Sequence, residues 1–192
     1  MLGWKVLGHE QRLDAHFVNY ADDFVICCRG TARESMTTMR AMMAKLKLTV
    51  NETKTRLCRV PDESFNFLGY TIGRCHKPRT GRAYIGTRPS AKAIQRLCLD
   101  VHEQTRRRWT FLDSGELVGR LNRMLQGWAN YFCLGPVGPA YNLVDRYVCS
   151  RLRQWLGRKH HVQGTSRSRF SNPYLHDRLG LITLPRCVPH FS

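Results

Sequence analysis

Three stretches in the second half of the sequence repeat apolar residues at helical spacing, and this pattern restricts the folds available to the chain. Amphipathic helices cannot bury such stripes one at a time, so the sequence predicts a small three-helix bundle over residues 89–159. The stripes are Ile94, Leu97 and Val101, then Leu117, Leu121, Leu125, Trp128 and Phe132, and finally Val144, Val148, Leu152 and Trp155.

The expected helix ends carry recognisable capping residues. Asp113 and Glu116 form a capping box before the second stripe, and the run 135–139, Gly-Pro-Val-Gly-Pro, separates the second helix from the third. Gly157 is expected to be the C-terminal cap of the third helix. The spacing of Trp128 and Trp155 favours packing in the core, and Gly127 is expected to allow close approach of two helices.

The first 88 residues follow a different pattern. Two short apolar runs, 16–20 and 24–28, flank Asp22 and Asp23, so they predict a β-hairpin with carboxylates at its tip. Residues 1–14 are expected to be a polar lead-in. The whole chain is therefore expected to be α+β, with antiparallel hairpins and one helix followed by an all-α module and a basic tail over 160–192.

The hairpin is followed by further elements with local signals. Thr31 and Glu34 predict a capping box for a methionine-rich helix that packs on the sheet. Residues 48–50 predict a short strand, and residues 65–72 a longer one with a bend at Gly69. A turn at 80–81 predicts a small hairpin in the basic segment 74–88, which either contacts nucleic acid or is a solvated connector.

Charge is the strongest compositional signal. Lys and Arg number 31 against 14 Asp and Glu, a formal net charge of +17. That excess favours a polyanionic partner, and the absence of a long apolar run favours nucleic acid over a membrane. The eight cysteines contain no Cys-x-x-Cys pair, so we expect reduced thiols and a cytoplasmic protein.

Adjacent aspartates at a hairpin tip suit a divalent metal ion, although Asp is also an ordinary turn residue. In the wider sequence the segment 17–25, which contains Tyr20-Ala21-Asp22-Asp23, resembles the catalytic hairpin of reverse transcriptases of the group II intron type. Residues 48–55 are similar to the next motif of that family, and residues 67–70 to its primer grip. The three segments occur in the family's order.

The resemblance implies roles for individual residues. Asp22 and Asp23 would be catalytic and hold Mg²⁺ in a complete palm, and Tyr20 would shape the pocket near the primer terminus. Lys54 would assist pyrophosphate departure, or it is a solvated surface lysine. The primer grip would be formed by Phe67, Leu68, Gly69 and Tyr70.

Residues 121–132 resemble the signature helix of the maturase-specific domain, also called the thumb, and residues 147–156 the helix after it. The resemblance implies binding of group II intron RNA and of a template-primer duplex. Basic residues on or beside these helices support an RNA-binding surface, although part of the set at 106–108 instead suits a helix C-terminal cap. The set is Arg106, Arg107, Arg108, Arg120, Arg123, Arg151, Arg153, Arg158 and Lys159. Candidates for stacking on bases are Trp109, Tyr131 and His160.

The family's further metal-binding Asp and its fingers lie upstream of the hairpin, and nothing before Asp22 in this sequence is similar to them. We therefore expect the C-terminal portion of an RNA-directed DNA polymerase and maturase that binds RNA and assists splicing. The isolated chain is expected to lack polymerase activity unless another chain supplies the N-terminal palm and fingers. The alternative is a general basic nucleic-acid-binding protein with an incidental Asp-Asp turn.

Overall fold

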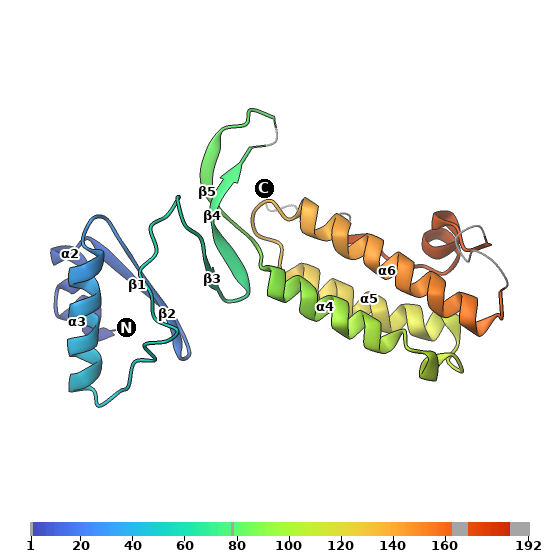
Figure 1. The fold of residues 1–192 in the computed structure, drawn as a ribbon, viewed down its shortest axis with the longest axis horizontal. Coiled ribbons are helices and arrows are strands. Elements are labelled where there is room, and N and C mark those ends of the chain that lie inside the picture. The colour runs from blue at the N-terminus through green and yellow to red at the C-terminus, as the bar shows by residue number, and fades with distance from the viewer. Residues whose placement is uncertain (1, 78, 163–168, 185–192) are drawn as a thin grey trace. The chain divides into compact units, whose positions relative to one another are not determined.

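The computed structural model describes residues 2–77, 79–162 and 169–184. Contacts divide the chain into two compact units, Met1–Phe67 and Leu68–Ser192. Helices and small antiparallel sheets both occur, which confirms the α+β class (Figure 1).

Unit 1 contains a two-stranded antiparallel sheet and one long helix. Its elements are α1 (Leu2–Val6), α2 (His9–Arg12), β1 (Ala15–Tyr20), β2 (Asp23–Cys28), α3 (Ala32–Lys45) and β3 (Phe65–Phe67). β1 and β2 form the predicted hairpin, in which Ala15 is opposite Cys28 and Tyr20 is opposite Asp23. The turn between them is tight, and Ala21 has a φ of 49°.

The core of unit 1 begins close to the N-terminus. Trp4 is 0% exposed, and its indole nitrogen donates a hydrogen bond to the Ala15 carbonyl at 2.8 Å. Trp4 packs with Phe17 and with the methionines Met39 and Met42 of α3. The expectation of a polar lead-in over residues 1–14 was therefore wrong, because α1 and α2 are too short to show helical periodicity in the sequence.

The methionine-rich helix packs on the hairpin as expected, but it lacks the predicted capping box. The Thr31 hydroxyl donates to the Leu13 carbonyl at 2.6 Å and does not cap the helix. Residues 48–50 form no strand. That segment is instead followed by a turn in which Glu52 accepts two hydrogen bonds from Arg40 of α3, at 3.0 and 2.6 Å.

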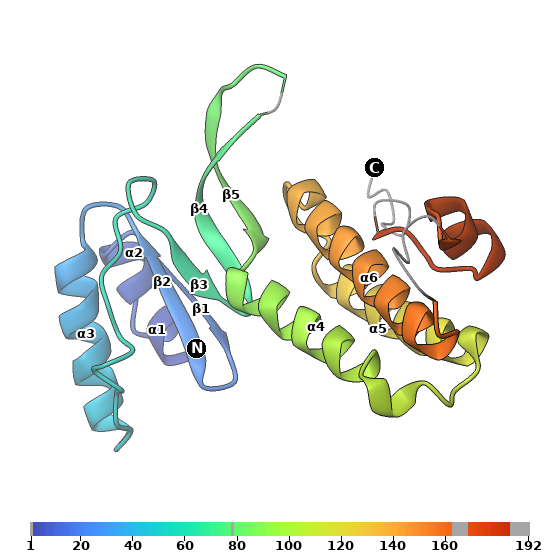
Figure 2. The same cartoon turned by 45° about the vertical axis from the view of Figure 1, so that its right-hand side comes forward.

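Unit 2 consists of a β-ribbon followed by a helical bundle. Its elements are β4 (Tyr70–His76), β5 (Ala83–Pro89), α4 (Ala91–Gln104), η1 (Arg107–Trp109), α5 (Ser114–Tyr131), α6 (Gly138–Lys159) and η2 (Tyr174–Arg178). β4 and β5 pair antiparallel from Tyr70 opposite Pro89 to His76 opposite Ala83, which confirms the hairpin predicted around residues 80–81. Figure 2 shows α4, α5 and α6 side by side as the predicted three-helix bundle.

The predicted stripes meet in one apolar core that includes Leu97, Leu121, Val148 and Leu152. Trp155 is 0% exposed, which confirms its packing role. The helix starts follow the expected chemistry in part: Asp113 accepts from the backbone N–H groups of Gly115 and Glu116 at the start of α5.

Two expectations about glycines in the bundle were wrong. Gly157 does not end α6, because it is buried inside the helix and the cap residue is His160. Gly127 does not mediate close helix packing, because a Cβ atom added there would meet nothing within 4 Å.

Part of the segment predicted as a basic tail packs against the bundle. Phe170, Leu175, Leu181 and Leu184 are buried in the same core as the three helices. The segment is also held by polar contacts, since the Leu184 N–H donates to both carboxylate oxygens of Asp145 at 3.2 and 3.3 Å.

Candidate functional site

The hairpin tip presents its polar residues to solvent. Asp22 occupies the turn and Asp23 begins β2, and both side chains are exposed. Alternation along the strands places Tyr20 and Asp23 together on the face opposite Phe17. Tyr20 is 66% exposed. The tip therefore offers two accessible carboxylates beside a tyrosine.

The tip has the right donor type for Mg²⁺, which prefers oxygen ligands. Among the described residues, however, no group of three or more His, Cys, Asp or Glu side chains could hold a metal ion. Two-metal phosphoryl transfer needs carboxylates that bridge two ions about 4 Å apart. The residues present in this part of the chain do not fit a two-metal centre, although Asp22 and Asp23 suit part of one.

Lys54 lies in an exposed turn that is organised by Asn51. The Asn51 carbonyl accepts from the backbone N–H of Lys54 at 3.1 Å and from the Thr55 hydroxyl at 2.8 Å. Within the described residues, no hydrogen bond or ion pair joins Lys54 to Asp22 or Asp23. The role of Lys54 in pyrophosphate departure stays a prediction.

The predicted primer-grip segment contains a tight turn fixed to the end of α5. Phe67 ends β3, while Leu68 and Gly69 have φ values of 50° and 77°. The Tyr131 hydroxyl donates to the Leu68 carbonyl at 2.9 Å, and the Tyr70 hydroxyl donates to the Tyr131 carbonyl. Burial raises the pKa of Tyr70, so this phenol stays neutral and able to donate.

Six of the nine cations predicted to bind RNA have partners within unit 2. Four of these contacts are Arg106 with Glu103 at 3.1 Å, Arg120 with Glu116 at 2.7 Å, Arg151 with Thr105 at 3.0 Å, and Arg153 with the Phe170 carbonyl at 2.8 Å. Arg108 also pairs with Glu103. Lys159 donates to the carbonyls of Thr110 and Leu112, at 3.1 and 2.7 Å.

The other three cations, Arg107, Arg123 and Arg158, are exposed. None of the three has an ion-pair partner in the part of the chain that the structure describes. They are the members of the predicted set that are freest to contact phosphate. The pairing of Arg106 and Arg108 with Glu103, in the last turn of α4, agrees with the alternative reading of that basic run as a helix-end feature.

The stacking candidates differ in their surroundings. Tyr131 is 54% exposed. Trp109 is half-buried, with the guanidinium carbons of Arg108 and Arg120 at 5.3 and 5.8 Å from its ring centroid. His160 lies 6.0 Å from the Phe170 ring, centroid to centroid. Tyr131 and His160 are therefore the stacking candidates with exposed side chains.

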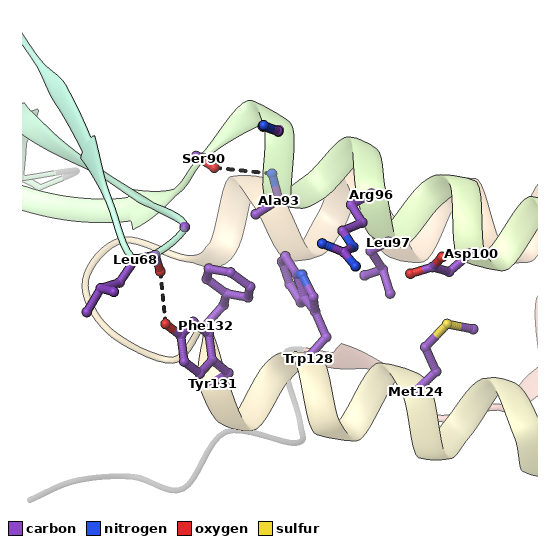
Figure 3. A pocket seen from close by; sticks show the side chains of 12 residues that line it. Leu68, Ser90, Ala93, Arg96, Leu97, Asp100, Met124, Trp128, Tyr131 and Phe132 are labelled. Carbon is purple, nitrogen blue, oxygen red and sulfur yellow. Dashed lines mark hydrogen bonds between the residues drawn. The ribbon is translucent and has the colours of Figure 1, made fainter. Parts of the chain in front are cut away.

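A pocket of about 490 Å³ lies between α4, the end of α5 and the turn at Leu68 (Figure 3). Its lining contains residues that the sequence analysis did not select, namely Lys92, Arg96 and Asp100. These three are spaced four residues apart on α4, so they occupy one side of the helix. That spacing was visible in the sequence, but only the fold shows that it borders a pocket.

Two family models match different parts of the chain. Residues 5–72 match the family model for reverse transcriptase (RNA-dependent DNA polymerase), and residues 94–174 match that for the group II intron, maturase-specific domain. An "Uncharacterized 91 kDa protein in cob intron" of Schizosaccharomyces pombe is 25% identical over an alignment of 134 residues that covers 60% of this chain. The match spans 17% of that relative's length. No helix among the described residues is both long and apolar enough to cross a membrane.

Proposed function

Because the chain joins a reverse transcriptase segment to a group II intron maturase-specific domain, we propose that it binds group II intron RNA and assists splicing. The observation that carries the proposal is the coincidence of the maturase match with a compact helical core. That core is contained within unit 2 and includes residues from Leu97 to Leu184. RNA binding of this kind does not require the hairpin of unit 1.

The surface chemistry of unit 2 supports the proposal. Arg107, Arg123 and Arg158 are exposed cations without ion-pair partners among the described residues, and Tyr131 offers an exposed aromatic ring. Cations that contact phosphates supply affinity, and aromatic rings hold unstacked bases. Arg106, Arg108, Arg120, Arg151, Arg153 and Lys159 are proposed as a supporting set, because each already has a partner within unit 2.

The proposed role of the hairpin is narrower. Asp22 and Asp23 hold Mg²⁺ productively only when a further carboxylate from another palm strand completes the centre, with Tyr20 and Lys54 beside it. Phe67, Leu68, Gly69 and Tyr70 are proposed to guide the primer strand in that complete palm. Without those additions the chain is expected to lack RNA-directed DNA synthesis, and a chain that supplies the N-terminal palm and fingers would be its partner.

The proposal is tested by binding and splicing assays with an in vitro transcribed group II intron. Electrophoretic binding at stepped salt should show tighter binding to the intron than to a plain RNA duplex of equal length. Addition of the chain should speed splicing under conditions in which the RNA alone reacts slowly. Equal affinity for every duplex would instead favour a general basic nucleic-acid-binding protein.

The same assay can distinguish the contributions of the two units to RNA binding. Asp22→Ala should leave RNA binding unchanged, because this exposed carboxylate lies in unit 1 and RNA binding is assigned to unit 2. A large loss of binding would contradict the assignment of RNA binding to unit 2. Template-dependent primer extension by the purified chain with Mg²⁺ would overturn the proposed lack of autonomous synthesis.

A further inference from the structure

The pocket beside the start of α4 has the walls of a site for a flat ring. Trp128, Tyr131 and Phe132 line it from α5 and its C-terminal end, and Leu97 and Met124 add apolar surface. Figure 3 shows the aromatic side chains grouped between α4 and the turn at Leu68. A volume of about 490 Å³ is within the range of small-molecule sites and exceeds that needed by one nucleobase.

The aromatic walls are held by contacts with one another and with Tyr141. The ring centroids of Trp128 and Phe132 lie 4.9 Å apart. The Tyr141 hydroxyl donates to the carbonyl oxygens of Ala129 and Phe132, at 3.1 and 2.9 Å. A pocket that is rigid before binding loses less entropy when it takes a ligand.

One buried polar atom in this wall lacks a partner. Trp128 Nε1 is buried and has no hydrogen-bond acceptor among the described residues. A buried N–H without an acceptor is costly, and indole nitrogens are usually paired. The atom is sealed from water, so a ligand in the pocket packs on the Trp128 ring and leaves the N–H as it is.

The rim of the pocket carries charge on one side of α4. Lys92, Arg96 and Asp100 are exposed, and none of them has an ion pair within the described parts of the chain. Figure 3 shows Arg96 and Asp100 on the α4 side, across from Trp128 and Met124 of α5. The guanidinium suits a phosphate, and the carboxylate can only accept hydrogen bonds.

We propose that this pocket binds a single unstacked nucleotide of the RNA, with its base against the aromatic wall and its phosphate at Lys92 and Arg96. Asp100 accepts hydrogen bonds from N–H groups of the base. Guanine is therefore preferred over uracil, because guanine offers a carboxylate two adjacent donors, N1–H and the exocyclic amine, whereas uracil offers one. This inference rests on the proposed RNA binding for its biological ligand, but the pocket can be tested with free nucleotides.

The first experiment follows the indole N–H signals of the full chain by NMR. The sequence contains four tryptophans, so the Trp128 signal can be assigned by its absence in Trp128→Phe. GMP at millimolar concentration should shift that signal, and UMP should shift it less. An unmoved Trp128 signal, or the same shift with inorganic phosphate alone, would overturn the proposal.

Variants separate the parts of the site. Trp128→Ala removes the aromatic ring from the wall, so affinity for GMP should fall about tenfold. Arg96→Gln should weaken binding of GMP while leaving binding of guanosine unaffected. The variant loses only the contact with the phosphate, which guanosine lacks. Asp100→Asn should reduce the preference for GMP over UMP, because an amide can donate as well as accept.

Arg123→Gln is the matched control, since Arg123 is exposed on α5 and does not line the pocket. It should leave nucleotide binding unchanged while it weakens binding of long RNA. A Trp128 signal that moves with protein concentration alone would show that a second copy fills the pocket, which would also overturn the proposal.

The two proposals fail in distinguishable ways. If free nucleotides bind at Trp128 but the intron RNA is not preferred over a duplex, the pocket stands and the splicing role fails. If the intron RNA binds with the expected preference and Trp128→Ala has no effect on either ligand, the pocket assignment alone is wrong.

Discussion

Two glycines near the end of α5 have opposite structural requirements. Gly135 has a φ of 82°, and a Cβ atom there would lie 2.1 Å from the Thr87 carbonyl oxygen. Gly127 lies within α5, where a Cβ atom would meet nothing within 4 Å. One glycine is required by the backbone and by its neighbour, whereas the other only weakens its helix.

Alanine substitutions should therefore change stability in opposite directions. Gly135→Ala should destabilise the chain by at least about 2 kcal/mol, because neither the backbone strain nor the clash with Thr87 can relax easily. Gly127→Ala should stabilise it by about 1 kcal/mol through helix propensity. Chemical denaturation of both variants beside the parent chain measures the two effects, and equal midpoints would contradict this account.

Asp145 is a second residue whose surroundings determine its contribution to stability. Burial raises the pKa of this carboxyl, although the Leu184 N–H and His176 act in the opposite direction. A carboxyl with a raised folded pKa contributes most to stability below its unfolded pKa, and that contribution is lost as the pH rises through the folded pKa.

Asp145→Asn should keep an oxygen acceptor for the Leu184 N–H while it removes the buried charge. The variant should therefore unfold at a higher temperature than the parent at neutral pH. The difference should disappear at a pH below the ordinary carboxyl range, where both side chains are neutral. Thermal melts at the two pH values test this, and a variant that is less stable at neutral pH would show that the charge itself holds the C-terminal segment.

At the scale of elements, the start of α5 depends on a side-chain cap that the start of α3 lacks. Hydrogen bonds from the N–H groups of Gly115 and Glu116 lower the pKa of Asp113. This contribution to stability is present above the unfolded carboxyl pKa and is lost as the pH falls through the lower folded value.

Asp113→Ala should lower the melting temperature of unit 2 at neutral pH, and Asp113→Asn should lower it much less because Asn also caps helices. The loss from Asp113→Ala should shrink at acidic pH, where the parent aspartic acid is itself protonated. Circular dichroism melts over a pH series measure both effects. A loss that does not change with pH would point to packing instead of capping.

The elements also show how far sequence alone could lead. The stripes of the bundle and the alternation of the hairpin were predictable, because long periodic patterns reflect burial on one face. The prediction of a helix end at Gly157 was wrong, because packing on the bundle keeps α6 helical through a residue that usually ends helices. The residues at 48–50 are apolar enough for a strand, but the structure gives them no pairing partner.

The candidate site was predictable to a different degree in each unit. The tip of the hairpin followed from Asp22 and Asp23 between two apolar runs, and the turn at Gly69 from a glycine inside a strand pattern. The pocket could not be predicted, because it depends on the distance between α4 and the end of α5. Trp128 shows the difficulty: its core spacing favoured packing over stacking, yet the residue also lines the pocket.

At the scale of the whole molecule, a net charge of +17 makes phosphate binding sensitive to salt. Many cations of unit 2 are already engaged, however, so charge number alone does not give the number of phosphate contacts. The exposed residues Arg107, Arg123 and Arg158 should release counterions on binding, whereas Arg106 and Arg120 should contribute less because they pair with acidic neighbours.

Replacing each exposed arginine with glutamine should reduce the slope of log affinity against log salt by about one. The matched changes Arg106→Gln and Arg120→Gln should reduce it by much less. Fluorescence binding of the full chain to an intron RNA at several salt concentrations measures the slopes. Equal reductions in both groups would mean that the ion pairs open when RNA binds.

The alternation of the β1–β2 hairpin has a practical consequence for chemical labelling. Cys27 is the exposed cysteine among those that the structure describes, and it lies on the strand face opposite Phe17. Partial desolvation raises the pKa of the Cys27 thiol, so alkylation should be slow at neutral pH and faster in mildly alkaline buffer. The rate at which a maleimide modifies this thiol would then report whether another chain covers the open face of the hairpin.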